Sequence, residues 1–351
     1  MHRMWLVLAG MLLVFSREAM EAAQKAAHIY VTAVLPALFP MMVLGGLAGR
    51  SDGQQRGRGL FLVLFGFCAG SPAAARQTAL LHECSPFGSK QLKPLLCMCG
   101  VMSPMFFTGS LASRLGSKAG FLMLLAHWAG ALGTGALCRL WLARPRPAKS
   151  HHPAPPQAGQ APAAQITPSP KPQQQPLTGL LAQSISSAAG ALLSVLGAMM
   201  LFSILAALPH ALLRRFCPAL TEAARPALAL VQGLLEVGSG CFALLESGAP
   251  PWLLCALCSF GGLSIWLQNL LFLGKMIRPA ELLCWRTLHG GISGVFCYGL
   301  LRLLPAAETA GAWQAASAAG SPSLWVILLL IPLALPHLWA CGRSRTCWPH
   351  S

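Results

Sequence analysis

Long apolar segments that are nearly free of charge follow one another along most of this chain, and they constrain its fold more than any other feature. Of the 351 residues, 55% are hydrophobic and only 10% are charged, whereas a soluble domain carries roughly 25% charged residues. So few charges cannot cover a hydrophobic core of that size with polar surface. The sequence therefore predicts an all-α polytopic membrane protein, surrounded by a lipid bilayer.

The formal net charge of +16 does not indicate a nucleic-acid partner here. In a soluble protein such a charge favours nucleic-acid binding, but these basic residues lie in loops, where they hold the loops on the cytoplasmic side. No basic stretch alternates with aromatic residues, as single-strand binding requires. We therefore expect no nucleic acid among the partners.

The chain lacks the residue patterns of the common enzymes. It has no Gly-x-Ser-x-Gly elbow, no His-Glu-x-x-His motif, no phosphate-binding loop and no close carboxylate pair. Most of the 13 cysteines lie inside apolar runs without accompanying His or acidic clusters, so we expect them to pack as small hydrophobic side chains. We predict no enzymatic activity, no metal and no cofactor, and leave open a coupling ion, H⁺ or Na⁺.

Composition divides the chain into six parts. Residues 143–176 consist mainly of Pro, Ala and Gln, so they cannot bury enough apolar surface to fold and are predicted to form a disordered linker. The predicted parts are a short N-terminal span (1–16), a first repeat (17–142), the linker (143–176), a second repeat (177–304), a C-terminal span (305–342) and a tail (343–351).

Similar strings occur in the same order in the two halves. "VLPALFPMMVL" (34–44) parallels "VLGAMMLFSIL" (195–205), and "CAGSPAA" (68–74) parallels "EVGSGCF" (236–242). "PLLCMC" (94–99) parallels "WLLCALC" (252–258), and a fourth match aligns His127 with His289. The separations of about 160 residues predict one duplicated unit.

Loop charges give the relative orientation of the two predicted repeats. If segments 60–81 and 226–245 each enter and leave the membrane on one side, each repeat crosses three times and the two repeats are inverted. Most Lys and Arg then lie on the side of the linker and both termini, as the positive-inside rule requires. The prediction is about eight transmembrane helices plus two re-entrant hairpins, with the linker and both termini cytoplasmic.

Four interruptions break the apolar segments, two in each predicted repeat. Paired breaks in inverted repeats are typical of transporters, which bind solute near the midplane, where broken helices expose backbone groups and helix ends. Ser264 and Gln268 are four residues apart and share a face of a helix. The predicted binding residues are Gly70, Ser71, Pro72, Arg76, Gln77, Ser103, Pro104, Glu236, Gly238, Ser239, Gly261, Gly262, Ser264, Gln268 and Asn269.

Each of these features also has a structural interpretation. Gly and Pro are common in membrane helices and often serve only packing. An acid such as Glu236 costs roughly 3 kcal/mol at the centre of a membrane helix and is functional by default; it binds a cation, relays a proton or pairs with Arg76. Arg76 alternatively lies at the membrane interface. His127 and His289 either shuttle protons or donate hydrogen bonds between packed helices.

The order of these motifs resembles the Gate, or nucleoside-recognition, domain family. "VLPALFPMMVL", "GSPAAARQ", "VMSPMFFTGS" and "LLAHWAGAL" in the first half, with "LLEVGSG" and "SFGGLSIWLQ" in the second, are most similar to the YlbJ-type sporulation integral membrane proteins of endospore-forming Firmicutes. The resemblance covers roughly 20–142 and 177–304. It implies a transporter related in fold to concentrative nucleoside carriers, which moves dipicolinic acid into the forespore during sporulation, in the cell membrane or the outer forespore membrane.

The chain departs from the family pattern at two positions. The first hairpin tip usually reads Gly-Tyr-Pro in the family, whereas this chain has Ser71 in place of the Tyr. At the second position the family usually has Asn before Pro, whereas this chain has Ser103. Dipicolinate is a small aromatic dianion, which suits helix N-termini and Arg76. Two alternatives remain: a membrane assembly factor for the spore envelope that carries no solute, and a nucleoside carrier of the same fold. The sequence does not determine the oligomeric state.

Overall fold

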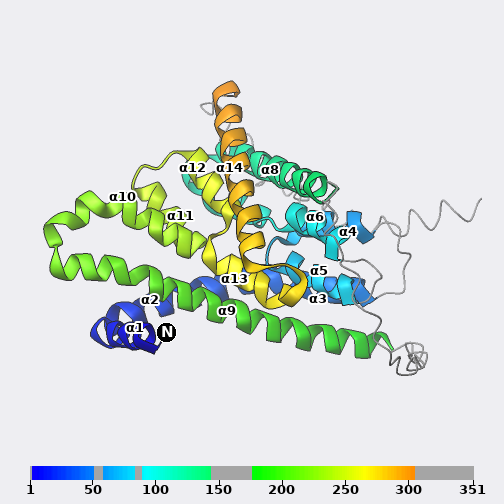
Figure 1. Ribbon diagram of the computed structural model, residues 1–351, viewed down its shortest axis with the longest axis horizontal. Helices are drawn as coiled ribbons and strands as arrows, with labels where there is room; N and C mark the ends of the chain where they lie inside the picture. The colour runs from blue at the N-terminus through cyan, green and yellow to red at the C-terminus, as the bar shows by residue number, and fades with distance from the viewer. Residues whose placement is uncertain (1, 51–57, 84–88, 144–175, 305–351) are drawn as a thin grey trace, which may run out of the picture.

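The computed structural model describes residues 2–50, 58–83, 89–143 and 176–304, and all regular structure in these ranges is helical. These residues form the all-α fold of a membrane protein, as predicted (Figure 1). The predicted C-terminal span (305–342), the tail (343–351) and nearly all of the linker (143–176) lie outside the described residues.

The chain begins with helices that bend before the first predicted hairpin. Helix α1 (His2–Val14) has 13 residues, which rise about 20 Å, less than the roughly 30 Å of a bilayer core. Helix α2 (Ser16–Ile29), a π-helical turn (Tyr30–Val34) and α3 (Leu35–Arg50) follow. The axes before and after the turn differ by 54°. This bend lies immediately before Pro36, where the missing N–H of proline removes a helical hydrogen bond.

The rest of the first half contains a pair of short helices, a broken helix and a long helix. The pair is α4 (Arg58–Ala69) and α5 (Ala73–Glu83). The broken helix is α6 (Ser89–Cys99), followed after a gap by a π-helical turn (Phe106–Leu111) and α7 (Ala112–Leu115). The long helix is α8 (Ser117–Ala143).

The second half repeats this order after its own long entry helix, α9 (Leu177–Phe216). Prolines at the first position of α10, α12 and α14 suit a helix start, where no N–H partner is needed. The elements are α10 (Pro218–Leu235), α11 (Val237–Glu246), α12 (Pro251–Phe260), α13 (Gly262–Leu273), a 3₁₀ turn (Gly274–Met276) and α14 (Pro279–Leu303).

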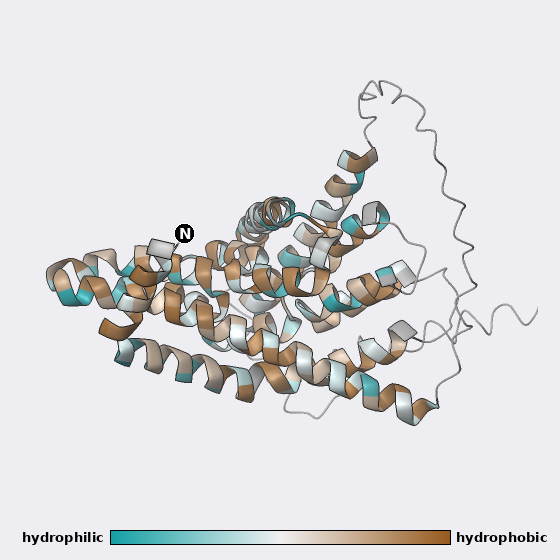
Figure 2. Cartoon of the chain, turned by 60° about the horizontal axis from the view of Figure 1, so that its bottom comes forward, coloured by the Kyte–Doolittle hydropathy of each residue, from teal (hydrophilic) through white to brown (hydrophobic). Residues whose placement is uncertain are grey.

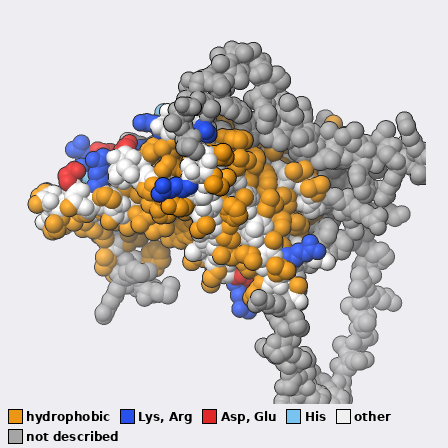
Figure 3. Space-filling view, turned by 90° about the horizontal axis from the view of Figure 1, so that it is seen from above, with side chains coloured by type: hydrophobic (Ala, Val, Ile, Leu, Met, Phe, Trp, Pro, Cys, Tyr) orange, Lys and Arg blue, Asp and Glu red, His pale blue; other side chains and the backbone are white. Residues whose placement is uncertain are grey.

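Three segments in the described part of the chain are long and apolar enough to cross a membrane: Ser117–Ala143, Leu177–Phe216, and Pro251–Leu273 across its break. The bent pair α2 and α3 would make a fourth. The predicted total of about eight crossings therefore stays a prediction. Apolar residues occur along most helices (Figure 2), and their side chains cover much of one outer face (Figure 3). Among them, Val295 of α14 and Leu193 of α9 are exposed, as contact with lipid requires.

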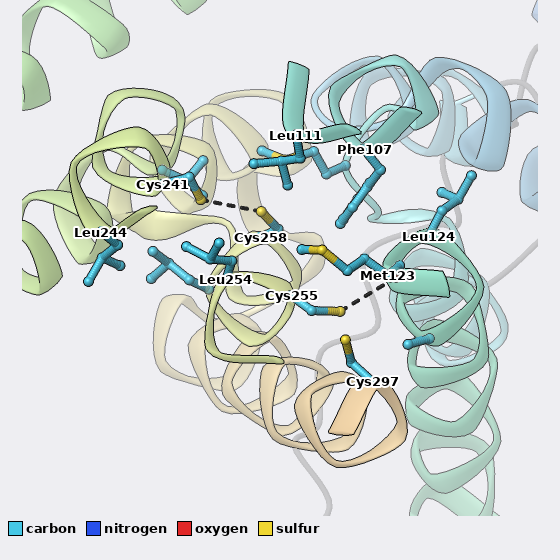
Figure 4. Close-up of a cluster of buried hydrophobic side chains, with 14 of the residues drawn as sticks. Phe107, Leu111, Met123, Leu124, Cys241, Leu244, Leu254, Cys255, Cys258 and Cys297 are labelled. Carbon is cyan, nitrogen blue, oxygen red and sulfur yellow. Dashed lines mark hydrogen bonds between the residues drawn. The ribbon is translucent and has the colours of Figure 1, made fainter. Parts of the chain in front are cut away.

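The largest buried cluster joins the two halves. Figure 4 shows Phe107, Met123 and Leu124 of the first half packed against Leu254 and several cysteines of the second. These cysteines are Cys241, Cys255, Cys258 and Cys297, all fully buried, and they fill the core as small apolar side chains, as expected. In the centre of Figure 1, α8 and α14 pack against each other, with α3 to α6 on one side and α10 and α11 on the other.

Candidate functional site

Each of the four predicted interruptions coincides with a break in a helix. Residues 70–72 separate α4 from α5, and residues 100–103 separate α6 from the helical turn that Pro104 begins. Glu236 alone separates α10 from α11, so Gly238 and Ser239 lie in the first turn of α11. Gly261 alone separates α12 from α13, and Gly262 begins α13.

The first hairpin, α4 with α5, contacts the broken helix of its own half through its tip. The Ser71 N–H donates to Val101 O at 2.6 Å. Gly70 has a φ of 73°, and a Cβ added there would lie only 2.7 Å from the Ser103 nitrogen. Both the left-handed backbone and the close approach therefore require glycine at this position. The tip lies directly on the break at residues 100–103.

Arg76 links the first hairpin to two other helices by hydrogen bonds. Its side chain is buried; Nη1 donates to Met42 O at 2.9 Å on α3, and Nη2 donates to Ser187 Oγ at 2.7 Å on α9. The side chain is therefore enclosed by protein, and these two bonds do not involve Glu236. Gln77 is buried beside Gly45 of α3. Both predicted binding residues point to neighbouring helices in this structure.

In the second hairpin, α10 with α11, the side chain of Glu236 caps the N-terminus of α11. Its Oε1 accepts from Gly238 N at 2.9 Å, and Oε2 accepts from both the N–H and the hydroxyl of Ser239 at 2.7 Å. Gln232 Nε2 donates to Ser239 Oγ at 3.0 Å. A carboxylate at a helix N-terminus is stabilised both by these bonds and by the helix dipole. The buried acid thus has its partners inside its own hairpin.

The second break is also closed by glycine contacts. Gly261 and Gly262 have φ values of 86° and 69°. A Cβ on Gly262 would lie 3.1 Å from Gly233 O and 3.2 Å from Val237 N, so the tip of the second hairpin packs on the start of α13. As in the first half, a hairpin tip and a broken helix meet backbone to backbone.

The predicted polar face of α13 is buried. Gln268 Nε2 donates to Ser264 Oγ at 3.0 Å, which confirms that the two residues share a face. Asn269 is buried as well, and its Oδ1 has no hydrogen-bond partner. Helix α13 packs against α5 of the first half and against α9 of its own half.

His127 and His289, which align in the two halves, contact each other close to the two breaks. The rings of His127 on α8 and His289 on α14 stack with centroids 4.9 Å apart. His127 Nε2 accepts from Met102 N at 2.9 Å, so Nδ1 carries the proton and donates to Ser259 Oγ at 2.6 Å. His289 Nε2 lies 3.0 Å from His127 O. Because His127 bonds to residues at both breaks, this geometry favours the structural role.

Arg286 of α14 is the residue that the sequence analysis missed. It is buried, and its Nε donates to Phe260 O at 2.9 Å. A Cβ added to Gly100 would lie 3.4 Å from Arg286 Nη1 and 3.9 Å from Ser71 Oγ. Arg286 Nη2 and Ser71 Oγ are both buried without a hydrogen-bond partner. Arg286 therefore lies between the two breaks, close to the first hairpin tip.

The electrostatic surroundings of Arg286 favour a cation. It lies beside the C-terminal ends of α6 and α12, where the helix dipoles carry partial negative charge. No acidic side chain forms an ion pair with it in the part of the chain that the structure describes. The helix ends supply only partial charges, so the guanidinium retains unused donor capacity for an anion.

A scan against protein-family models, a search of curated proteins and a search of solved structures each found no match. The resemblance to Gate-type proteins therefore stays a prediction from the sequence motifs.

Proposed function

We propose that this chain is a membrane transporter for a small anionic solute, which binds where the two breaks meet. In this proposal the halves are inverted repeats with re-entrant hairpins. Support comes from the order of elements, which is the same in both halves, and from the hairpin tip that packs on a broken helix in each. Short helices suit such a hairpin, because α4, α5 and α11 are each too short to cross a bilayer.

The single observation that carries the proposal is the buried guanidinium of Arg286 without an acidic partner. A basic side chain inside a membrane helix costs roughly 3 kcal/mol or more, and such residues mark solute pathways by default. Its Nη1 and the unpartnered hydroxyl of Ser71 both lie near Gly100, and its unpartnered Nη2 lies near Gly261. A carboxylate is the ligand class that accepts from both a guanidinium and a hydroxyl.

Dipicolinate is the solute we propose, on the strength of the motif resemblance. It carries two carboxylates, one of which would pair with Arg286. From the motif resemblance we also propose about eight membrane crossings and a location in the cell membrane or the outer forespore membrane during sporulation.

The test is uptake of radiolabelled dipicolinate by proteoliposomes that contain the full chain. We expect saturable uptake that Arg286→Gln reduces at least roughly tenfold, because the loss of one charge-assisted pair in a dry site has about this effect. Arg286→Lys should retain part of the uptake. The matched control is Arg302→Gln, which removes an exposed arginine of the same helix that lies over the Tyr298 ring and should leave uptake unchanged.

Other outcomes identify the alternatives. Uptake of labelled uridine, or strong competition by unlabelled uridine, would indicate a nucleoside carrier. No uptake of either solute by correctly inserted protein would contradict transport and favour the assembly factor. Size-exclusion profiles of each variant show whether a loss of uptake reflects misfolding.

A further inference from the structure

A cavity of about 350 Å³ lies between α2, α9 and the second hairpin. Glu236, Ser239 and Gln232 of the hairpin line it, together with residues of α2 and α9. Glu236 is only 6% exposed, whereas the side chains of Glu18 and Arg214 on the same cavity are 27% and 60% exposed. The cavity therefore leads from an exposed, charged rim to a buried carboxylate.

The cavity contains several other charged or titratable groups. Those facing Glu236 across it are Glu18, Glu21 and Lys25 of α2, and His210 and Arg214 of α9. Helices α10 and α11 contribute only neutral side chains to it beside Glu236 itself. Glu18 forms an ion pair with Arg214 at 3.0 Å, and Glu21 one with Arg17 at 2.9 Å. These pairs leave Glu236 as the acid at the buried end.

From this arrangement we infer that Glu236 is the proton-binding site of the transporter, reached through the cavity between α2 and α9. The inference rests on the proposed transport function and deepens it, because it assigns the coupling ion as H⁺. The surroundings of the carboxylate argue against a sodium ion. The neighbours of its oxygens are two N–H groups and one O–H group, all donors, whereas Na⁺ needs several oxygen acceptors directed at it.

Protonation of Glu236 changes the hairpin directly. The carboxylate takes up one H⁺ and becomes a neutral carboxylic acid, so its bonds to Gly238 N and to Ser239 lose the strengthening that ionic charge provides. The positive end of the α11 dipole loses its counter-charge in the same step. The first turn of α11 packs against Gly262, so a loosened cap releases the tip from the second break. Proton binding and opening at that break are thereby coupled.

The first readout is labelling by dicyclohexylcarbodiimide, which reacts with protonated carboxyl groups in apolar surroundings. The full chain in liposomes is treated over a range of pH and the modified residue is located by mass spectrometry. We expect modification at Glu236 that rises as the pH is lowered, and Glu236→Gln should lower the labelling of the chain at least about tenfold. The matched control, Glu246→Gln, removes an exposed acid of the same hairpin and should leave labelling intact. Absence of labelling at Glu236 in the wild-type chain, or labelling independent of pH, would overturn the inference.

The second readout is dipicolinate movement under an imposed gradient. An inward proton gradient should increase uptake by the wild-type chain and by Glu246→Gln, whereas Glu236→Gln should lose this response. Stimulation by a sodium gradient instead of a proton gradient would overturn the proposal. Labelling at Glu236 without any dipicolinate movement would support the proton site and contradict the transport function. Glu236→Asp, which retains an acid, keeps the labelling test usable if the Gln variant misfolds.

Discussion

The first hairpin directs its polar contacts to other helices, whereas the second directs them into itself. In α4 and α5, Ser71 bonds to Val101, and Arg76 bonds to Met42 and to Ser187. In α10 and α11, Glu236, Ser239 and Gln232 bond to one another or to their own backbone.

Both hairpin tips meet the backbone of a broken helix, but the glycines within the hairpin helices follow the same division. Gly66 of α4 lies against the backbone of Cys99 on α6, whereas Gly240 of α11 lies against the backbone of Gly233 on α10. The first hairpin is thus fixed between α3, α6 and α9. The second makes these polar bonds within itself, so it can shift without breaking polar bonds to other helices. We therefore expect the second hairpin to be the moving gate and the first to be a fixed support.

Cross-linking each hairpin to the broken helix of its own half tests this difference most strongly. Cys241 Sγ on α11 and Cys258 Sγ on α12 lie 3.3 Å apart, and the matched pair in the first half is Thr78 Oγ1 on α5 and Cys99 Sγ on α6, at 3.9 Å. Oxidation of the wild-type chain with copper phenanthroline should join Cys241 to Cys258 and reduce dipicolinate uptake at least roughly tenfold, because a tethered gate cannot open. Dithiothreitol should restore uptake.

Two variants complete this experiment. Cys258→Ser should make uptake insensitive to the oxidant. Thr78→Cys, combined with Cys258→Ser, should form a disulfide bond between the introduced thiol and Cys99 and retain uptake, because the first hairpin does not move. If this second bond abolishes uptake as fully as the first, the two hairpins move alike and the comparison fails. Mass spectrometry of peptides establishes which bond has formed.

The positions of the breaks were predictable, because the residues that cause them act locally. Gly70 and Gly261 adopt a left-handed backbone that other residues resist, and Pro72 and Pro104 lack an N–H. Glu236 was recognisable as an acid in an apolar run. Its function as a cap was not predicted, although the acid stands directly before the glycine and serine whose N–H groups it binds.

Removal of Arg76 should destabilise the chain by about 2–4 kcal/mol, since hydrogen bonds from a charged group contribute roughly 1.5–3 kcal/mol each. Arg76→Met keeps the length and apolar stem of the side chain but loses the bonds to Met42 O and Ser187 Oγ. The expected result is a lower midpoint of thermal unfolding in detergent. Arg114→Met, in the short helix α7, is the control and should change the midpoint little. An unchanged midpoint in Arg76→Met would show that the first hairpin is not fixed by this residue.

Arg286 was missed for a physical reason. It lies about one-third of the way along α14, shortly after Lys275 and Arg278, so it resembled the basic residues that hold loops in the cytoplasm. A charge inside a membrane segment is functional by default, and this holds for Arg286 as much as for Glu236. Its position between Gly100 and Gly261 required the structure, because those residues lie far apart in the chain and in different halves.

The smallest expected effect on stability concerns an ion pair that joins the two halves. Lys93 Nζ of α6 lies 2.8 Å from both carboxylate oxygens of Glu281 at the start of α14. The pair is partly exposed, with 19% and 18% of the side chains accessible, so we expect Lys93→Met to reduce the free energy of unfolding by only about 1 kcal/mol. A double-mutant cycle with Glu281→Gln measures the coupling, and the charge swap Lys93→Glu with Glu281→Lys should recover most of it. A coupling as large as the effect of Arg76→Met would mean that the halves are held together as firmly as the first hairpin is held to its neighbours. The second hairpin would then be the only part of the described fold left free to move against the rest.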